Sequence, residues 1–178
     1  EATHDLVLEL DNAGADLIEI GVPFSDPIAD GPVIQRSTER ALRNGTSLTQ
    51  ILELIEKIRK SSDIPLILMS YYNPLLNHGL KTLARQASEV GLDGILASDL
   101  TLEEADPFLE AMTLQKLDTI FLAAPTSSQE RVERIAATST GFLYALARTG
   151  VTGETERLSN ELVKSVRTLK ALTDTPVV

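Results

Sequence analysis

Short apolar runs alternate with helical patterns along this chain of 178 residues, and no other feature of the sequence constrains the fold as strongly. The runs have the length of strands and are apolar throughout, not at every second position. A strand that is apolar on both sides is covered on both sides, which is typical of a parallel sheet packed against helices. Because parallel crossovers are right-handed, the chain should form either an open doubly wound sheet or a (β/α) barrel.

Turn and capping residues give each predicted element approximate limits. The predicted strands are 16–22, 64–69, 94–97, 119–124, 141–147 and a last strand that begins in 175–178. The predicted helices are 4–13, 32–44, 47–60, 79–90, 101–115, 127–137 and 159–172. Capping boxes are predicted at Thr101 with Glu104 and at Ser127 with Glu130, and segment 70–74 is predicted to be a polar turn.

The loops that follow the predicted strands favour a barrel over an open nucleotide-binding sheet. No GxGxxG pattern follows the first strand, as a dinucleotide-binding sheet would require. Polar, acidic or glycine-bearing loops instead follow four strands, at 24–32, 70–74, 98–104 and 148–156, where barrels carry their chemistry. A closed barrel needs eight strands and roughly 250 residues. We therefore expect residues 1–178 to be a single α/β domain, an incomplete (β/α)8 TIM barrel truncated at both ends.

The composition excludes several classes of function. A formal net charge of −10 argues against nucleic acid and against an anionic membrane surface as partners. No window is both apolar and long enough to span a bilayer. The absence of cysteine excludes disulfides, thiolate metal sites and cysteine nucleophiles, and the two histidines have no ligand-like spacing. No signal-peptide pattern opens the chain, so a cytoplasmic location is expected.

Two acidic residues near the first strand are the candidate catalytic groups. Glu19 lies inside an apolar run, so its carboxyl group either faces solvent at a sheet edge, forms an ion pair, or enters a site. Asp30 lies in the following loop and could equally cap the helix that begins near Pro32. The residues alone leave these alternatives open.

Five motifs follow one another along the chain: IEIGVPFSDPIADGPVIQ, YYNP, DLTLEE, APTS and RTGVTG. In this order and at this spacing they resemble the tryptophan synthase alpha subunit family, and the resemblance covers essentially the whole chain. It implies about strands 2 to 6 of a (β/α)8 barrel and the start of strand 7, with an extra helix at 33–44. The family usually has proline where this chain has Ser98 and Thr101, which leaves that loop less constrained.

The resemblance implies a lyase that cleaves indole-3-glycerol phosphate to indole and glyceraldehyde 3-phosphate in tryptophan biosynthesis, without a metal or organic cofactor. It implies that Glu19 is the catalytic acid and base at C3 of the indole ring. It implies that Asp30 accepts a hydrogen bond from the indole N–H group and stabilises positive charge on the ring. The substrate-binding residues that it implies are Tyr71, Leu96, Leu122, Tyr144, Thr152 and Gly153.

The resemblance also implies a partner, the beta subunit of tryptophan synthase, in an alpha2beta2 complex. The 178-residue piece by itself is expected to be inactive. Two alternatives remain: a non-catalytic alpha-like subunit that binds and activates a beta partner, and another phosphate-binding TIM-barrel lyase or isomerase. The intact pair Glu19 and Asp30 argues against the first, and the PFSDPIADGP loop argues against the second.

Overall fold

The computed structural model of the chain describes residues 2–146 and 160–178. Its five parallel strands are β1 (Ile18–Gly21), β2 (Leu66–Ser70), β3 (Gly94–Ala97), β4 (Asp118–Ala123) and β5 (Leu143–Ala145). Its helices are α1 (Ala2–Asn12), α2 (Pro32–Arg43), α3 (Leu48–Arg59), α4 (Tyr72–His78), α5 (Leu80–Glu89), the 3-10 helix η1 (Leu102–Glu104), α6 (Asp106–Leu114), α7 (Gln129–Thr138) and α8 (Asn160–Leu172).

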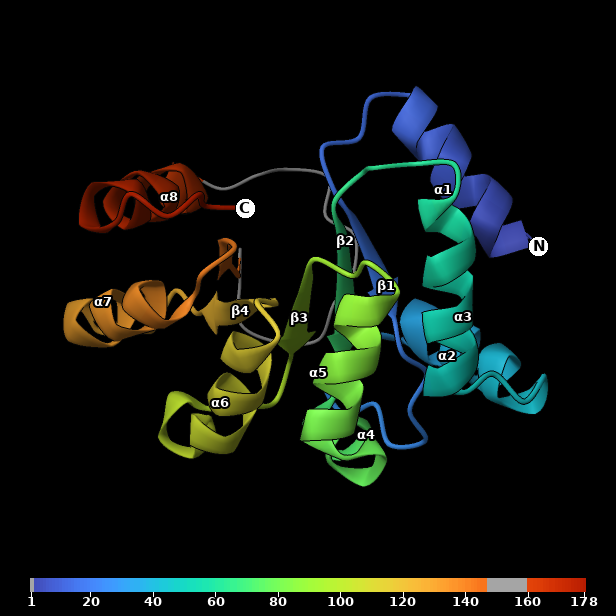
Figure 1. Ribbon diagram of the computed structural model, residues 1–178. Coiled ribbons are helices and arrows are strands. Elements are labelled where there is room, and N and C mark those ends of the chain that lie inside the picture. The colour runs from blue at the N-terminus through green and yellow to red at the C-terminus, as the bar shows by residue number, and fades with distance from the viewer. Residues whose placement is uncertain (1, 147–159) are drawn as a thin grey trace.

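The order of the strands distinguishes the two folds that the sequence allowed. In a doubly wound sheet the strand order reverses at a switch point, whereas here each strand pairs with the next one in the chain, β1-β2-β3-β4-β5. Helices α3, α5, α6, α7 and α8 follow one another along the same face of the sheet (Figure 1). A parallel bridge between Leu143 and Val177 adds the start of a further strand beside β5. The predicted partial (β/α)8 barrel is therefore confirmed.

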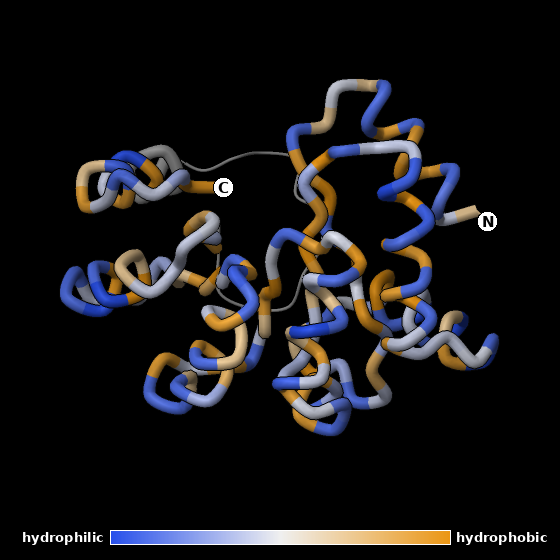
Figure 2. The backbone as a smooth tube through the Cα atoms, in the orientation of Figure 1, coloured by the Kyte–Doolittle hydropathy of each residue, from blue (hydrophilic) through white to orange (hydrophobic). Residues whose placement is uncertain are grey.

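Side chains from the strands form two separate apolar clusters, because successive residues of a strand point to opposite faces. The larger cluster lies between the strands and the helices, and its fully buried members include Ile55, Leu68, Ile95 and Phe108. The smaller cluster lies on the other face of the sheet and consists of Ile67, Leu96, Ile120 and Phe142. Figure 2 shows hydrophobic residues along the strands and on the helices around them. The smaller cluster corresponds to the interior of the barrel, and we call it the inner cluster. We call the larger cluster, between the strands and the helices, the outer cluster.

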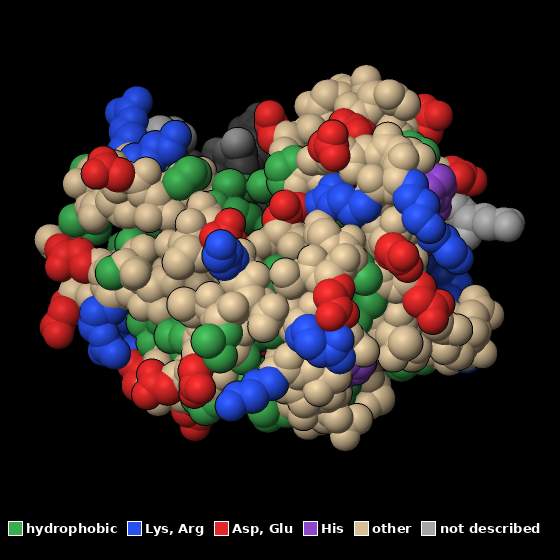
Figure 3. All heavy atoms as spheres, in the orientation of Figure 1, with side chains coloured by type: hydrophobic (Ala, Val, Ile, Leu, Met, Phe, Trp, Pro, Cys, Tyr) green, Lys and Arg blue, Asp and Glu red, His purple; other side chains and the backbone are tan. Residues whose placement is uncertain are grey.

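The helix-covered face carries acidic and basic side chains side by side, with no large patch of one sign (Figure 3). None of the helices in the described part of the chain combines the length and the apolar character that a membrane span requires.

The segment after β2 is helical where the sequence predicted only a polar turn. Helix α4 begins at Tyr72, with Pro74 in its first turn, and ends at His78. Proline is tolerated in the first turn because the N–H groups there have no partner within the helix. The predicted turn is wrong because Pro74 suits both a turn and the first turn of a helix, and the structure has the helix.

Both predicted capping boxes were wrong, for different reasons. The Thr101 side chain makes no capping bond, and α6 begins only at Asp106, where Pro107 occupies the second position of the helix. At α7 the capping residue is Ser128, whose hydroxyl accepts a hydrogen bond from the Arg131 N–H group. Two adjacent serines can each cap a helix, and the pattern of the sequence selected the wrong one.

Candidate active site

Glu19 lies in the middle of β1 on the same face as the inner apolar cluster. Its neighbours Ile18 and Ile20 belong to the outer cluster, and Leu17 packs against the inner one. In the parallel ladder Glu19 is paired with Ile67, a member of the inner cluster. The alternation of side chains along the strand therefore directs the Glu19 carboxyl group into the interior of the barrel.

The Glu19 carboxyl group is partly buried, and no described residue offsets the cost of its burial with a hydrogen bond to Oε1. Its Oε1 atom is buried and has no hydrogen-bond partner among the described residues. Burial raises the pKa of Glu19 above its usual value of 4.5, because a charged carboxylate loses hydration there. A buried, unpaired acid is costly for the fold, which makes a purely structural role difficult to explain and favours a functional one. The alternative of a structural ion pair finds no support among the described residues.

Leu96, Leu122 and Tyr144 all belong to the surroundings of the inner cluster. Leu96 is fully buried within it, and Leu122 and Tyr144 pack against it. Burial and the facing charge of Glu19 raise the pKa of the Tyr144 hydroxyl, which shows that this hydroxyl lies near the carboxyl group of Glu19. Three of the predicted substrate-binding residues therefore come together with Glu19 on one apolar face.

Asp30 is brought to the end of β2 by Tyr71. The Tyr71 hydroxyl accepts a hydrogen bond of 2.9 Å from the N–H group of Ala29, the residue before Asp30. The ring of Tyr71 also packs against Phe24, at 5.3 Å between ring centroids. Asp30 does not cap α2 through its side chain, because the N-cap residue of that helix is Gly31. The loop after β1 thus contacts Tyr71, the residue after β2, near both of its ends.

Asp99 continues this chain of contacts to the next strand. Its Oδ1 atom accepts a hydrogen bond of 2.6 Å from the Tyr72 N–H group, at the start of α4. The carboxylate therefore satisfies one of the free N–H groups of that helix. An acidic residue shortly after a strand indicates an acceptor of backbone hydrogen bonds, and Asp99 has that role. The sequence did not indicate which N–H group it would bind, because that depends on α4, which was not predicted.

Thr152 and Gly153, which the resemblance placed in the substrate site, lie outside the described residues. Among the residues that are described, no group of three His, Cys, Asp or Glu side chains could hold a metal ion. The arrangement is therefore an apolar face with one protonatable acid on β1 and a second acid held over the end of β2. Such a pair can deliver a proton to a flat apolar ligand and stabilise positive charge on it.

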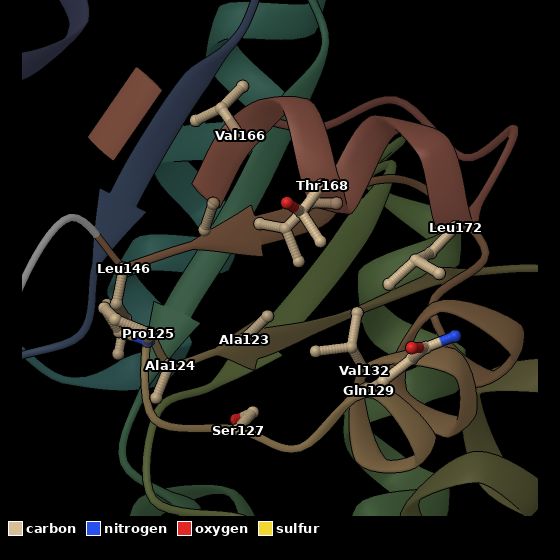
Figure 4. Close-up of a pocket in the computed structure, with 12 residues that line it drawn as sticks. Ala123, Ala124, Pro125, Ser127, Gln129, Val132, Leu146, Val166, Thr168 and Leu172 are labelled. Carbon is tan, nitrogen blue, oxygen red and sulfur yellow. The ribbon is translucent and has the colours of Figure 1, made fainter. Parts of the chain in front are cut away.

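A cavity of about 240 Å³ lies outside the candidate active site. It opens between α7 and α8 above β4 and β5 (Figure 4). Ala123 and Ala145, which line it, face the outer cluster, so this cavity is on the opposite side of the sheet from Glu19. Its other labelled lining residues include Val132, Thr168 and Leu172, and none of the lining residues is charged. It is not part of the candidate active site.

Comparison with known proteins decides the family. The family model for the tryptophan synthase alpha chain matches residues 1–178. The chain belongs to the tryptophan synthase alpha chain family. Among its relatives, the tryptophan synthase alpha chain of Solibacter usitatus is 52% identical over 175 residues, which are 98% of this chain and 66% of the relative. That of Geotalea uraniireducens is 46% identical over 178 residues, 100% of this chain and 67% of the relative.

Solved structures of the tryptophan synthase alpha family agree with the fold described above. A chain from the tryptophan synthase a2b2 complex of Pyrococcus furiosus superimposes with a TM-score of 0.91 at 38% sequence identity. The match covers 98% of this chain and 70% of that one. The chain thus spans about two thirds of the length of the curated relatives named above. The described strands and helices are the corresponding portion of the tryptophan synthase alpha barrel.

Proposed function

We propose that the protein is a lyase that cleaves indole-3-glycerol phosphate to indole and glyceraldehyde 3-phosphate, as the alpha subunit of tryptophan synthase. The observation that carries this proposal is the Glu19 carboxyl group on the inner apolar face of a chain of this family, with its Oε1 atom buried and without a hydrogen-bond partner among the described residues. An acid with a raised pKa holds its proton closer to neutral pH, where it can act as a general acid.

The reaction needs a proton on C3 of the indole ring before the bond to the glycerol side chain can break. Glu19 donates this proton, and the positive charge that develops on the ring is stabilised by Asp30 at the indole N–H group. The resulting Glu19 carboxylate then takes the proton of the side-chain hydroxyl. As that hydroxyl becomes the aldehyde, the carbon–carbon bond breaks and its electrons restore the aromatic ring. Glu19 ends the cycle protonated, and no oxidant or reductant is consumed.

The apolar side chains around Glu19 suit the indole ring. Leu96, Leu122 and Tyr144 offer an apolar surface on the same face as the acid. Contacts from Thr152 and Gly153 to the substrate remain predictions that rest on the family resemblance. An assembly with a beta subunit is supported by the related chain from the Pyrococcus furiosus a2b2 complex. A cytoplasmic location also remains a prediction.

The test is release of indole from indole-3-glycerol phosphate by the full-length protein. Replacing Glu19 with Gln keeps the shape of the side chain and removes the transferable proton, so turnover should fall by about 10² to 10⁴. Glu56→Gln, on the exposed face of α3, is the matched control and should retain turnover. Turnover at the wild-type level in Glu19→Gln would refute the assignment. Stimulation of a beta partner without any indole release would indicate the non-catalytic alternative.

A further inference from the structure

The contacts of Tyr71 point to a function other than direct contact with a substrate. Its side chain is only 6% exposed, and the residue lies directly after the last residue of β2. The loop after β1 covers it, with Phe24 against its ring and Ala29 at its hydroxyl. A ligand in the barrel therefore meets little of the Tyr71 surface.

The Tyr71 hydroxyl holds the backbone directly before Asp30. It accepts a hydrogen bond of 2.9 Å from the Ala29 N–H group. Burial, and then the facing charges of Asp30 and Asp99, raise the pKa of Tyr71, so the hydroxyl keeps its proton. Tyr71 therefore fixes the loop at the residue next to Asp30.

The position of Tyr71 is in turn set from β3. Asp99 accepts a hydrogen bond of 2.6 Å from the N–H group of the adjacent residue, Tyr72. The ladder continues beyond β3 as well, since the Ser98 N–H group donates to the Ser70 carbonyl oxygen at 2.8 Å. The start of α4, and with it the backbone of Tyr71, is thus fixed by the residues that follow β3.

We propose that Tyr71 is the positioning residue for Asp30, and that Asp99 supports it through the Tyr72 N–H group. The effect of Tyr71 on turnover rests on the proposed function, whereas its contact with the loop does not. Without the Tyr71 hydroxyl the loop after β1 keeps its ring contact with Phe24 but loses the hydrogen bond that fixes the backbone next to Asp30. Displacement of a reacting group by about 1 Å can cost a factor of about 100 in rate.

The kinetic test uses Tyr71→Phe in the full-length protein, with Tyr72→Phe as the matched control. Tyr72 is the adjacent tyrosine, but its ring packs edge-on against Phe108 in the outer cluster, at 6.4 Å. For Tyr71→Phe we expect kcat to fall about 10-fold to 100-fold with KM nearly unchanged, because the apolar ring remains. Tyr72→Phe should retain wild-type kcat. An unchanged kcat in Tyr71→Phe would overturn the proposal.

A double-mutant cycle separates positioning from an independent contribution. If Tyr71 acts through Asp30, then Tyr71→Phe should cost less than about threefold when Asp30→Asn is already present. If the two losses multiply, Tyr71 acts on its own and the proposal is wrong. The remaining activity of Asp30→Asn is measured in single turnover with excess enzyme, so that slow variants can be compared.

Hydrogen exchange of the Ala29 amide gives a measurement that does not depend on the reaction. The Ala29 N–H group should exchange faster in Tyr71→Phe than in the wild type and in Tyr72→Phe, because its acceptor is gone. Unchanged exchange would overturn the proposed contact. If the wild type releases no indole while this exchange difference is present, the proposed function fails and the catalytic meaning of Tyr71 fails with it, but the contact with the loop holds.

Discussion

On the inner face of the sheet, in the middle of β1, the buried Oε1 atom of Glu19 has no hydrogen-bond partner among the described residues. At the amino ends of the strands, by contrast, Arg59 donates hydrogen bonds to four partners. Arg59, the last residue of α3, donates hydrogen bonds of 2.6 Å to the carbonyl oxygens of Gly91 and Ile64. It also donates to the Ser62 carbonyl oxygen at 3.3 Å and to the Asp93 carboxylate. These contacts join the loops that precede β2 and β3.

The two regions differ because they have different functions in a parallel barrel. Barrels carry their chemistry toward the carboxyl ends of the strands, whereas residues at the amino ends contribute stability. At the amino ends the guanidinium group of Arg59 satisfies backbone carbonyl groups. On the inner face the Glu19 Oε1 atom has no partner among the described residues, a cost that fits the proposed function. The comparison predicts that changes in the two regions will separate stability from turnover.

Arg59→Ala should have the largest effect on stability. Its side chain is 17% exposed, and its removal leaves carbonyl groups without donors, so we expect a loss of about 2–3 kcal/mol in the free energy of unfolding. Urea denaturation of the full-length protein measures it. Arg43→Ala is the control, since that side chain is 78% exposed. Turnover per folded molecule should be unchanged, and a loss of turnover without a loss of stability would break the comparison.

Gly94→Ala should destabilise the protein by about 1–3 kcal/mol. A Cβ atom at Gly94 would lie 2.9 Å from the Asp118 carbonyl oxygen and 3.0 Å from Ile120 Cδ1. The Asp118 carbonyl oxygen cannot move freely, because Gly94 and Asp118 are paired in the β3–β4 ladder. Gly21→Ala, at the carboxyl end of β1, is the control, since its Cβ would meet nothing within 4 Å among the described residues. Equal unfolding midpoints for the two variants would contradict this account.

Glu19 should make stability depend on pH, with a smaller effect. Because the pKa of Glu19 is raised in the folded state, the folded protein binds more protons than the unfolded chain once the pH exceeds about 4.5. Stability should therefore be fully retained below that pH and fall as the pH rises through the raised pKa, by at most about 1.4 kcal/mol per pH unit.

The measurement is the difference in unfolding free energy between the wild type and Glu19→Gln, from pH 4 to pH 8. Glu19→Gln lacks the titrating group, so it should become the more stable of the two as the pH rises. A difference that is flat, or that favours the wild type at high pH, would show that the cost of burying this acid has been misjudged.

Arg131→Ala should have the smallest effect. Arg131 pairs with Glu103 at 2.9 Å at the carboxyl end of the sheet, but the two side chains are 39% and 50% exposed. Exposed ion pairs contribute little, because water and salt screen them. The urea midpoint should match that of the wild type at low and at high salt. A loss as large as that of Arg59→Ala would show that the number of ion pairs matters more than their burial.

The fold was largely predictable because the strands have a simple pattern. Apolar runs of strand length between amphipathic helices indicated parallel strands, and the five motifs indicated which barrel. Local details were less predictable where one residue suits two conformations. Pro74 suits both a turn and a first helical turn, and Ser127 and Ser128 compete for one cap. At α4 the choice depends on a contact that is distant in the sequence, the hydrogen bond from the Tyr72 N–H group to Asp99.

For the candidate site, the sequence indicated Glu19 and Asp30, but not how they are held. Alternation along β1 already separates Glu19 from Ile18 and Ile20, so the inward direction of the acid follows from local geometry once the inner face is known. The link from Asp99 through Tyr72 and Tyr71 to Asp30 joins three separate strands. No pattern along the chain could have shown it.

The sequence by itself determined the class of fold, the positions of most elements and the identity of the two acids, because these depend on periodicity and on short motifs. Only the tertiary structure decided that the Glu19 Oε1 atom is buried with no hydrogen-bond partner in the described part of the chain, and that the Tyr71 hydroxyl holds the backbone next to Asp30. Burial and hydrogen bonding depend on residues brought together by folding. The electrostatic properties of the site therefore belong to the assembled sheet and not to any one of its segments.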